Sequence, residues 1–378
     1  MNKKNKINEV LDRFGPQTSE LQRAFARQFL RHAPAIDDGE ESASQQAQLI
    51  SAFFVFLRQR RSGELLIRVY NPSEQSHGWS SSHTVVEMVN DDMPFLVDSV
   101  VLALSRLDIG VHLIIHPVVR LKRDQGGHFL DMADETVSKR FGAESLIHIR
   151  IDRQTSPDAL ARIERRIRSA LADVRVAVND WTEMTRKALE IADELAESKS
   201  GLDADELAEA RDFFKWLADR HFTFLGYREY LILPSDDGRV LAPVDESGLG
   251  LMRDSHRQSP SRLISDLSGD SRGIGGEIHP IIITKTNGRA TVHRDGYMDY
   301  ISVLRFDDSG RVSGEKRIIG LFTSGAYIRR CHDTPLVRLK VERVLDQSGL
   351  RPGSHAGKAL MHILETLPRD ELFQAGID

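Results

Sequence analysis

Within residues 84–180, apolar residues recur at the two-residue repeat of strands in some segments and at the longer repeat of helices in others. Few folds accommodate the order of these segments. Apolar stripes at helical spacing begin after Pro94 and again at Pro157. Strand-like runs precede, separate and follow the two helices. This order, βαββαβ, predicts a ferredoxin-like domain, in which two helices cover one face of a four-stranded antiparallel sheet. The strands are expected at 84–90, 109–123, 145–152 and 174–180.

The turn between the first strand and the first helix reads NDDMPFLVDSVV over residues 90–101. Asp91 or Asp92 is suited to cap the helix by accepting its free N–H groups, and Pro94 suits the first turn. The N-terminus of a helix also attracts anions, such as the carboxylate of an amino acid. We therefore take this turn as the candidate effector site, comprising Asn90, Asp91, Asp92, Met93, Pro94, Phe95 and Asp98.

Helices are also predicted on both sides of a second, strand-rich region. Leu21, Phe25 and Phe29 recur at helical spacing near the N-terminus, and Asp203 is a plausible N-cap for a later helix. Asn287-Gly288, between two strand-like runs, is typical of a two-residue hairpin turn. Helices are expected within 7–33, 44–61, 181–219 and 334–374, a strand at 62–71, and further strands between 222 and 325.

These patterns predict an α+β protein. It has N-terminal helices, the ferredoxin-like domain, and then a second antiparallel-sheet domain with flanking helices. A chain of 378 residues is long enough for two or three domains. The expected segments are an N-terminal helical unit at 1–71, the ferredoxin-like domain at 84–180, a helical connector at 181–219, a β-rich domain at 220–330, and C-terminal helices at 331–378 that lead to a downstream region.

Composition narrows the classes of function. The net charge of −5 disfavours a nucleic-acid partner, because phosphate binding normally needs a basic protein. Cys331 is the only cysteine, so a disulfide framework and a cysteine-based zinc site are excluded. Neither a secretory signal nor an apolar run long enough to cross a bilayer occurs. We therefore expect a cytoplasmic protein without a membrane partner.

No motif in the sequence predicts chemistry. The glycines at 273–277 lack the spacing of a dinucleotide fingerprint, and no phosphate-binding loop occurs. His112 and His116 would lie about 13 Å apart on one strand, too far to share an ion. Basic neighbours favour the thiolate of Cys331, but no histidine partner is evident nearby. The sequence thus predicts no catalytic, cofactor-binding or metal-binding residue.

Residues 84–119, TVVEMVNDDMPFLVDSVVLALSRLDIGVHLIIHPVV, resemble an ACT domain. Such domains are βαββαβ modules that typically sense small molecules, often amino acids, and regulate metabolic enzymes. The resemblance is carried by Asn90, Asp92, Pro94 and the DIGVHL step. ACT loops usually have glycine after the proline, where this chain has Phe95. Its side chain would fill the space through which a ligand approaches the backbone.

A wider resemblance covers nearly the whole chain. It is similar to the N-terminal region of the large, bacterial-type NAD-dependent glutamate dehydrogenases, in which ACT-like and helical modules serve regulation and assembly. Their dehydrogenase domain lies far downstream, and their NAD and glutamate residues have no counterparts here. The resemblance is carried by NDDMPFLVDSV, HPVVRLKRD, RHFTFLGYREY, RDGYMDYISVLRFDDSGRVSGEKRIIGLFTS and HAGKALMHILETLPRDELFQ.

This second resemblance implies the role of the chain. The full-length parent would be an oxidoreductase that converts L-glutamate to 2-oxoglutarate and ammonium with NAD. The segment itself would be non-catalytic and hold no cofactor. Its implied partners are its own downstream catalytic domain, further copies of itself in a homo-oligomer, and an amino-acid effector.

Two alternatives remain open. The chain could be a stand-alone metabolite sensor, in which the ACT-like block or a PAS-like or ACT-like sheet domain at 220–330 binds the ligand. It could also be a purely structural module that pairs subunits. Stabilisation by an amino acid would favour the sensor, because a ligand that binds only the folded state must stabilise it. Light scattering would test the structural module.

Overall fold

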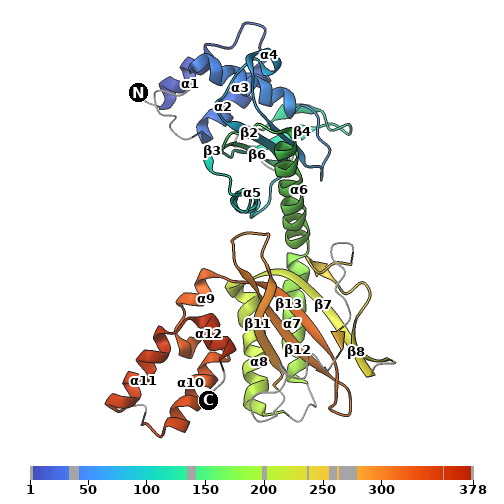
Figure 1. Cartoon of the computed structure of the whole chain (residues 1–378), viewed down its shortest axis with the longest axis vertical. Coiled ribbons are helices and arrows are strands. Elements are labelled where there is room, and N and C mark those ends of the chain that lie inside the picture. The colour runs from blue at the N-terminus through green and yellow to red at the C-terminus, as the bar shows by residue number, and fades with distance from the viewer. Residues whose placement is uncertain are drawn as a thin grey trace. The chain divides into compact units, whose positions relative to one another are not determined.

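The computed structural model divides into two compact units (Figure 1). Each unit has its own hydrophobic core. The first unit comprises Met1–Val174 with Thr291–Arg294, and the second comprises Arg175–Ala290 with Asp295–Asp378. The finer division into five segments stays a prediction. The structure describes residues 3–33, 42–133, 142–197, 202–235, 238–254, 262–263, 279–351 and 353–375.

The helices that begin in the first unit include three near the N-terminus that pack around phenylalanines. Phe25, Phe29 and Phe53 are almost completely buried, with edge-on contacts between their rings. Ser42 and Gln45 form a reciprocal capping box at the third helix. The described helices are α1 (Lys3–Leu11), α2 (Glu20–His32), α3 (Ala43–Phe56), α4 (Glu74–His77), α5 (Leu96–Ser105) and α6 (Pro157–Asn179).

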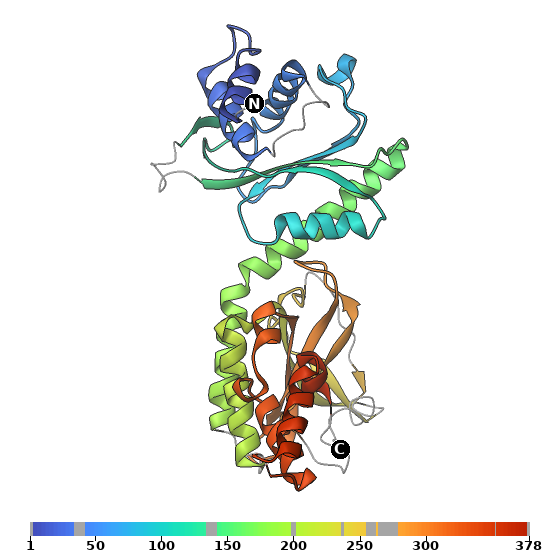
Figure 2. The same ribbon diagram turned by 90° about the vertical axis from the view of Figure 1, so that its left-hand side faces the viewer.

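An antiparallel sheet forms the centre of the first unit. Its strands are β1 (Leu66–Tyr70), β2 (Thr84–Asp91), β3 (Val111–Ile115), β4 (Val118–Arg123), β5 (Phe129–Met132) and β6 (Gly142–Ile151). Their order is β1-β2-β6-β4-β5, and β3 also pairs with β6. The N-terminal helices cover one face, because Val85, Val89 and Leu146 share their core, whereas α5 and α6 lie on the other face (Figure 2).

The strand predicted at 174–180 is wrong, because α6 continues through these residues to Asn179. Ile167, Leu171, Val174 and Ala177 are all buried and recur every three or four residues, so the helical stripe never breaks. The place beside β2 that this strand would have taken is occupied by β1, which precedes β2 in the chain. The unit therefore keeps an ACT-like sheet but takes one edge strand from its N-terminal side.

The second unit begins with two helices and continues with a second antiparallel sheet. The helices are α7 (Trp181–Ala196) and α8 (Ala204–Trp216), followed by the π-helical turn η1 (Leu217–His221). Asp203 caps α8 as predicted, by accepting from the N–H groups of Asp205 and Glu206. The strands are β7 (Phe222–Ser235), β8 (Gly238–Pro243), β9 (Leu249–Gly250), β10 (Arg262–Leu263), β11 (Ile281–Arg289), β12 (Tyr297–Phe306) and β13 (Val312–Phe322).

The second sheet has the order β10-β8-β7-β13-β12-β11, with β9 paired to β7. One core joins α7, α8, one sheet face and the C-terminal helices, with Phe213, Tyr227 and Ile318 among its members. Together the two sheets and their helices confirm the predicted α+β class. The C-terminal elements are α9 (Ser324–Ile328), η3 (Cys331–Asp333), α10 (Val337–Ser348), α11 (His355–Thr366) and α12 (Arg369–Gln374).

The hairpin turn predicted at Asn287-Gly288 is also wrong. Strand β11 runs through both residues to Arg289, with a register shift after Lys285 that absorbs them as a bulge. The chain reverses later, where the N–H of Ala290 donates to the carbonyl of Gly296 over 2.8 Å. Gly201, within the helical connector expected at 181–219, and the glycines at 273–277 lie outside the described residues.

None of the helices in the described parts of the chain combines the length and apolar character that a bilayer crossing needs.

Candidate functional site

Asp91, in the predicted effector turn, is held by ion pairing and not by helix capping. Its carboxylate lies 2.6 Å from the guanidinium of Arg60 and accepts from the N–H of Gly63 over 3.1 Å. Arg60 is buried, with only 1% of its side chain exposed. Asn90, at the end of β2, is buried as well. Asp91 therefore joins β2 to the segment before β1.

Asp92 is tied to the neighbouring strand β6. Its N–H donates to the carbonyl of Ala143 over 3.0 Å, and its carboxylate accepts from the hydroxyl of Ser145 over 2.7 Å. The Ser145 hydroxyl also contacts the His116 ring over 3.1 Å. The prediction that Asp91 or Asp92 caps α5 is wrong, since both carboxylates are turned toward other partners.

Phe95 itself stands at the N-cap of α5, and no side chain caps that end. Its φ of 71° lies in the left-handed region, which glycine occupies without a steric penalty. Pro94 precedes this position, so the prediction that it lies in the first turn of the helix is wrong. Met93 and Phe95 are half-buried, whereas Pro94 and Asp98 are exposed, with Asp98 in the first turn.

A cavity of about 490 Å³ adjoins the predicted turn. Of the predicted residues, Asp91 lines it, together with Arg60, Arg123 and Glu144. Arg123 forms a two-pronged pair with Glu144 at 2.6 and 2.8 Å, and Arg60 lies 3.2 Å from the same carboxylate. The buried charges of this wall thus compensate one another, so they stabilise the wall more readily than they bind a ligand.

The histidines of the first sheet do not meet at a metal site. His148 is fully buried and lies 3.0 Å from the carboxylate of Glu87. Burial opposes the ionisation of Glu87, but the hydrogen bonds and charges of His148 and Arg68 outweigh it and lower the pKa of Glu87. His112 pairs with Asp152 instead. No cluster of metal-ligating side chains occurs among the residues that the structure describes.

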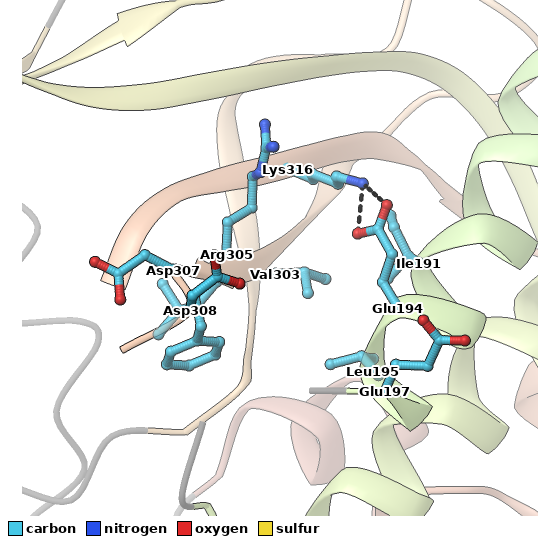
Figure 3. A pocket seen from close by; sticks show the side chains of 11 residues that line it. Ile191, Glu194, Leu195, Glu197, Val303, Arg305, Asp307, Asp308 and Lys316 are labelled. Carbon is cyan, nitrogen blue, oxygen red and sulfur yellow. Dashed lines mark hydrogen bonds and ion pairs between the residues drawn. The ribbon is translucent and has the colours of Figure 1, made fainter. Parts of the chain in front are cut away.

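A second cavity, of about 420 Å³, lies in the second unit between α7 and the β12–β13 hairpin (Figure 3). Lys316 stands at its base, with its Nζ donating to both oxygens of Glu194 at 2.5 and 2.6 Å. Lys316 is buried, but 58% of the Glu194 side chain is exposed. The residues that line the cavity are Ile191, Glu194, Leu195, Glu197, Val303, Leu304, Arg305, Phe306, Asp307, Asp308 and Lys316.

Two of the residues that line this cavity, Arg305 and Lys316, are positively charged. Arg305 pairs with Glu229 over 3.0 Å, and the hydroxyl of Tyr227 donates to the same carboxylate over 2.7 Å. Burial opposes the ionisation of Glu229, but the Tyr227 hydroxyl and the charges of Lys316 and Arg305 outweigh it and lower the pKa of Glu229. Glu229 thus neutralises part of the positive charge, while Lys316 keeps an exposed partner on the cavity side.

Sequence reasoning missed this second cavity. Lys316 stands in the strand-like run EKRIIGLF, where a lysine is ordinarily a solvated side chain. The one available signal was the strand repeat, which puts Lys316 on the same face as Ile318, a core residue. Glu194 comes from the predicted connector, and only the fold brings it to this strand.

Comparison with known proteins gives two matches to family models. The model described as the ACT1 domain of glutamate dehydrogenase matches residues 25–167. The model described as helical motif 1 of glutamate dehydrogenase matches residues 334–378. The first match begins within α2 and ends in α6, so it includes β1, the edge strand that precedes β2.

Curated relatives agree with the family models. The chain is 38% identical over 315 residues to an NAD-specific glutamate dehydrogenase of Pseudomonas aeruginosa, covering 82% of this chain and 19% of that protein. It is 35% identical over 356 residues to the enzyme of the same name from Halomonas elongata, covering 94% and 22%. A relative of that name from Mycobacterium tuberculosis is 26% identical over 328 residues, covering 86% and 19%.

The chain therefore spans about a fifth of the length of the relatives that it matches. Both family models occur in chain order, and the alignments to the relatives cover most of its residues. This chain belongs to the family of the large NAD-specific glutamate dehydrogenases.

Proposed function

We propose that this chain is the N-terminal, non-catalytic regulatory and assembly segment of an NAD-dependent glutamate dehydrogenase. The observation that carries the proposal is the pair of family matches at 25–167 and 334–378 of this chain, together with relatives that are more than four times as long. In this proposal the full-length cytoplasmic enzyme converts L-glutamate to 2-oxoglutarate and ammonium with NAD. The catalytic residues and the NAD site then lie in the remaining four-fifths of such an enzyme.

The ACT1 match supports a regulatory role, because ACT domains typically sense small molecules. The predicted turn from Asn90 to Asp98 stays a proposed effector site, and the cavity beside Asp91 is the space available there. Because Arg60 and Arg123 are already paired with carboxylates, an anion that binds in this cavity would have to displace one of those carboxylates. Assembly into a homo-oligomer, with contacts to the downstream catalytic domain, is the second part of the proposal.

A direct assay tests the non-catalytic assignment. The purified chain is incubated with L-glutamate and NAD at the protein concentration used for a full-length relative, and NADH formation is followed by its absorbance. We expect no turnover from the chain and normal turnover from the full-length enzyme. Glutamate-dependent NADH formation by the chain alone, retained after repurification, would overturn the proposal.

Light scattering tests the assembly role. If this segment contributes subunit contacts, the purified chain should show a mass above that of its monomer, and the mass should rise with concentration. A monomer at every concentration would assign the contacts of the parent to its downstream region.

A further inference from the structure

We propose that the cavity between α7 and the β12–β13 hairpin binds a small zwitterion with an apolar body, such as an aliphatic amino acid. The carboxylate of the ligand would bind Lys316, and its ammonium group would face the acidic rim of the cavity. A regulatory meaning for this site rests on the proposed function, but the binding itself does not.

Lys316 is the anchor of the proposed site. Its side chain is 5% exposed, and a buried ammonium group is costly unless an anion compensates it. Within the described residues the anion paired with it is Glu194, a side chain that is 58% exposed. Exposed carboxylates are held weakly, because water competes for them. A ligand carboxylate can therefore compete with Glu194 for the ammonium group of Lys316.

The walls of the cavity suit an apolar body. Ile191 and Val303 are almost completely buried and face the cavity from opposite sides, with Leu195 and Phe306 beside them. Figure 3 shows Ile191 and Leu195 on the helix and Val303 on the strand across from them. The cavity volume of about 420 Å³ lies within the range typical of sites for small molecules.

The rim of the cavity suits an ammonium group. Glu197 and Asp308 are exposed, and Glu197 stands at the C-terminal end of α7, where the helix dipole favours cations. Asp307 is less available, because it accepts from the N–H groups of Ser309 and Arg311. A ligand with one carboxylate and one ammonium group thus meets a cation at the base and carboxylates at the rim.

Titration with L-leucine and its two half-molecules tests the proposal on the intact chain. Backbone amide NMR shifts are followed for L-leucine, for 4-methylpentanoate, which lacks the ammonium group, and for 3-methylbutylamine, which lacks the carboxylate. We expect L-leucine to shift residues of α7 and of the β12–β13 hairpin, and each half-molecule to bind more weakly. Absence of saturable shifts with L-leucine, or equal binding by the amine alone, would overturn the proposal.

Two substitutions give opposite expected effects. Lys316→Met should weaken L-leucine binding roughly ten- to a hundredfold, because it removes the cationic donor. Glu194→Gln should strengthen binding roughly two- to fivefold, because it removes the internal competitor. Glu183→Gln is the matched control, since Glu183 lies on the same helix and pairs with Arg186 outside the cavity. Unchanged or weakened binding in Glu194→Gln would contradict the displacement, even if Lys316→Met does not fold.

These outcomes are separable from those of the proposed function. Failure of L-leucine to bind removes this site and leaves the assignment of the chain as a non-catalytic segment untouched. Turnover of glutamate by the chain alone would remove that assignment and leave the binding result standing.

Discussion

At the residue scale, predictions from the sequence are wrong where residues other than glycine adopt left-handed backbone conformations. Phe95, Asp108, Arg220 and His293 all have positive φ values, yet none is a glycine. The sequence offered no reason to expect this at Phe95, because a bulky side chain disfavours that region. The prediction from local propensity therefore started helix α5 too early and assigned its cap to Asp91 or Asp92.

Arg220 allows a clean measurement of this backbone strain. It lies in the turn between α8 and β7 with a φ of 61°, and its side chain is exposed. We expect Arg220→Gly to raise the free energy of unfolding by about 0.5–1 kcal/mol, because glycine adopts this conformation without a clash. Chemical denaturation of the second unit measures the change.

Arg220→Ala is the matched control for this substitution. Alanine also removes the side chain but keeps the Cβ atom that causes the strain, so its free energy of unfolding should stay close to that of the wild type. Equal stabilisation by both variants would show that the Arg220 side chain, and not the backbone, was unfavourable.

At the element scale, the wrong predictions come from sequence patterns that are compatible with two different local structures. The run VRVAVN at 174–179 alternates like a strand, but it continues the buried stripe of α6 without a glycine or proline to end the helix. Asn287-Gly288 is typical of a hairpin, but it also fits the bulge that β11 contains. The capping of α8 by Asp203 was predictable, because its signal is local and has no competitor.

Lys340 connects two C-terminal helices and gives a pH-dependent prediction. It lies on α10, and its Nζ donates to the carbonyls of Phe373 and Ala375 at 2.8 Å, at the end of α12. Burial lowers the pKa of Lys340 to about 8 from an ordinary value of 10.5. Between these values the unfolded chain binds the proton and the folded chain does not, so stability should rise as the pH increases from 8 toward 10.

Comparison with Lys340→Met isolates this contribution. That variant should lack the rise, whereas Lys358→Met, at an exposed position of α11, should keep it. Thermal unfolding of the three proteins at intervals between pH 8 and 10 provides the measurement. Burial raises the pKa of tyrosines such as Tyr227 above the ordinary value of 10.0. Such tyrosines lower the stability of the folded chain as the pH rises above 10, so they set the upper limit of the pH window. A parallel pH profile in wild type and Lys340→Met would refute the prediction.

At the scale of the whole molecule, two separate cores follow from two separate sheets. The fold class and the family were accessible from the sequence, because several segments resemble the family in order along the chain. The two cavities were not, because their walls combine residues far apart in the sequence, such as Arg60 with Glu144 and Glu194 with Lys316. Such pairs become visible only when the sheets bring the segments together.

The separate cores predict two unfolding transitions. Phe29→Ala, in the core of the first unit, and Phe213→Ala, in that of the second, should each destabilise one transition by about 3–5 kcal/mol. Differential scanning calorimetry should show each variant lowering the midpoint of its own transition. Leu130→Ala, at a side chain that is 52% exposed, should lower neither. A single transition that shifts equally in both core variants would contradict the independence of the cores.

The position of β1 has a consequence for the timing of folding during synthesis. Because the edge strand beside β2 comes from the N-terminal side, every strand of the first sheet has been synthesised once Ile151 leaves the ribosome. A final strand at 174–180 would have left β2 unpaired along one side until those residues emerged. The first unit can thus complete its sheet before α6 has left the ribosome, which shortens the time for which an open edge is available to neighbouring nascent chains.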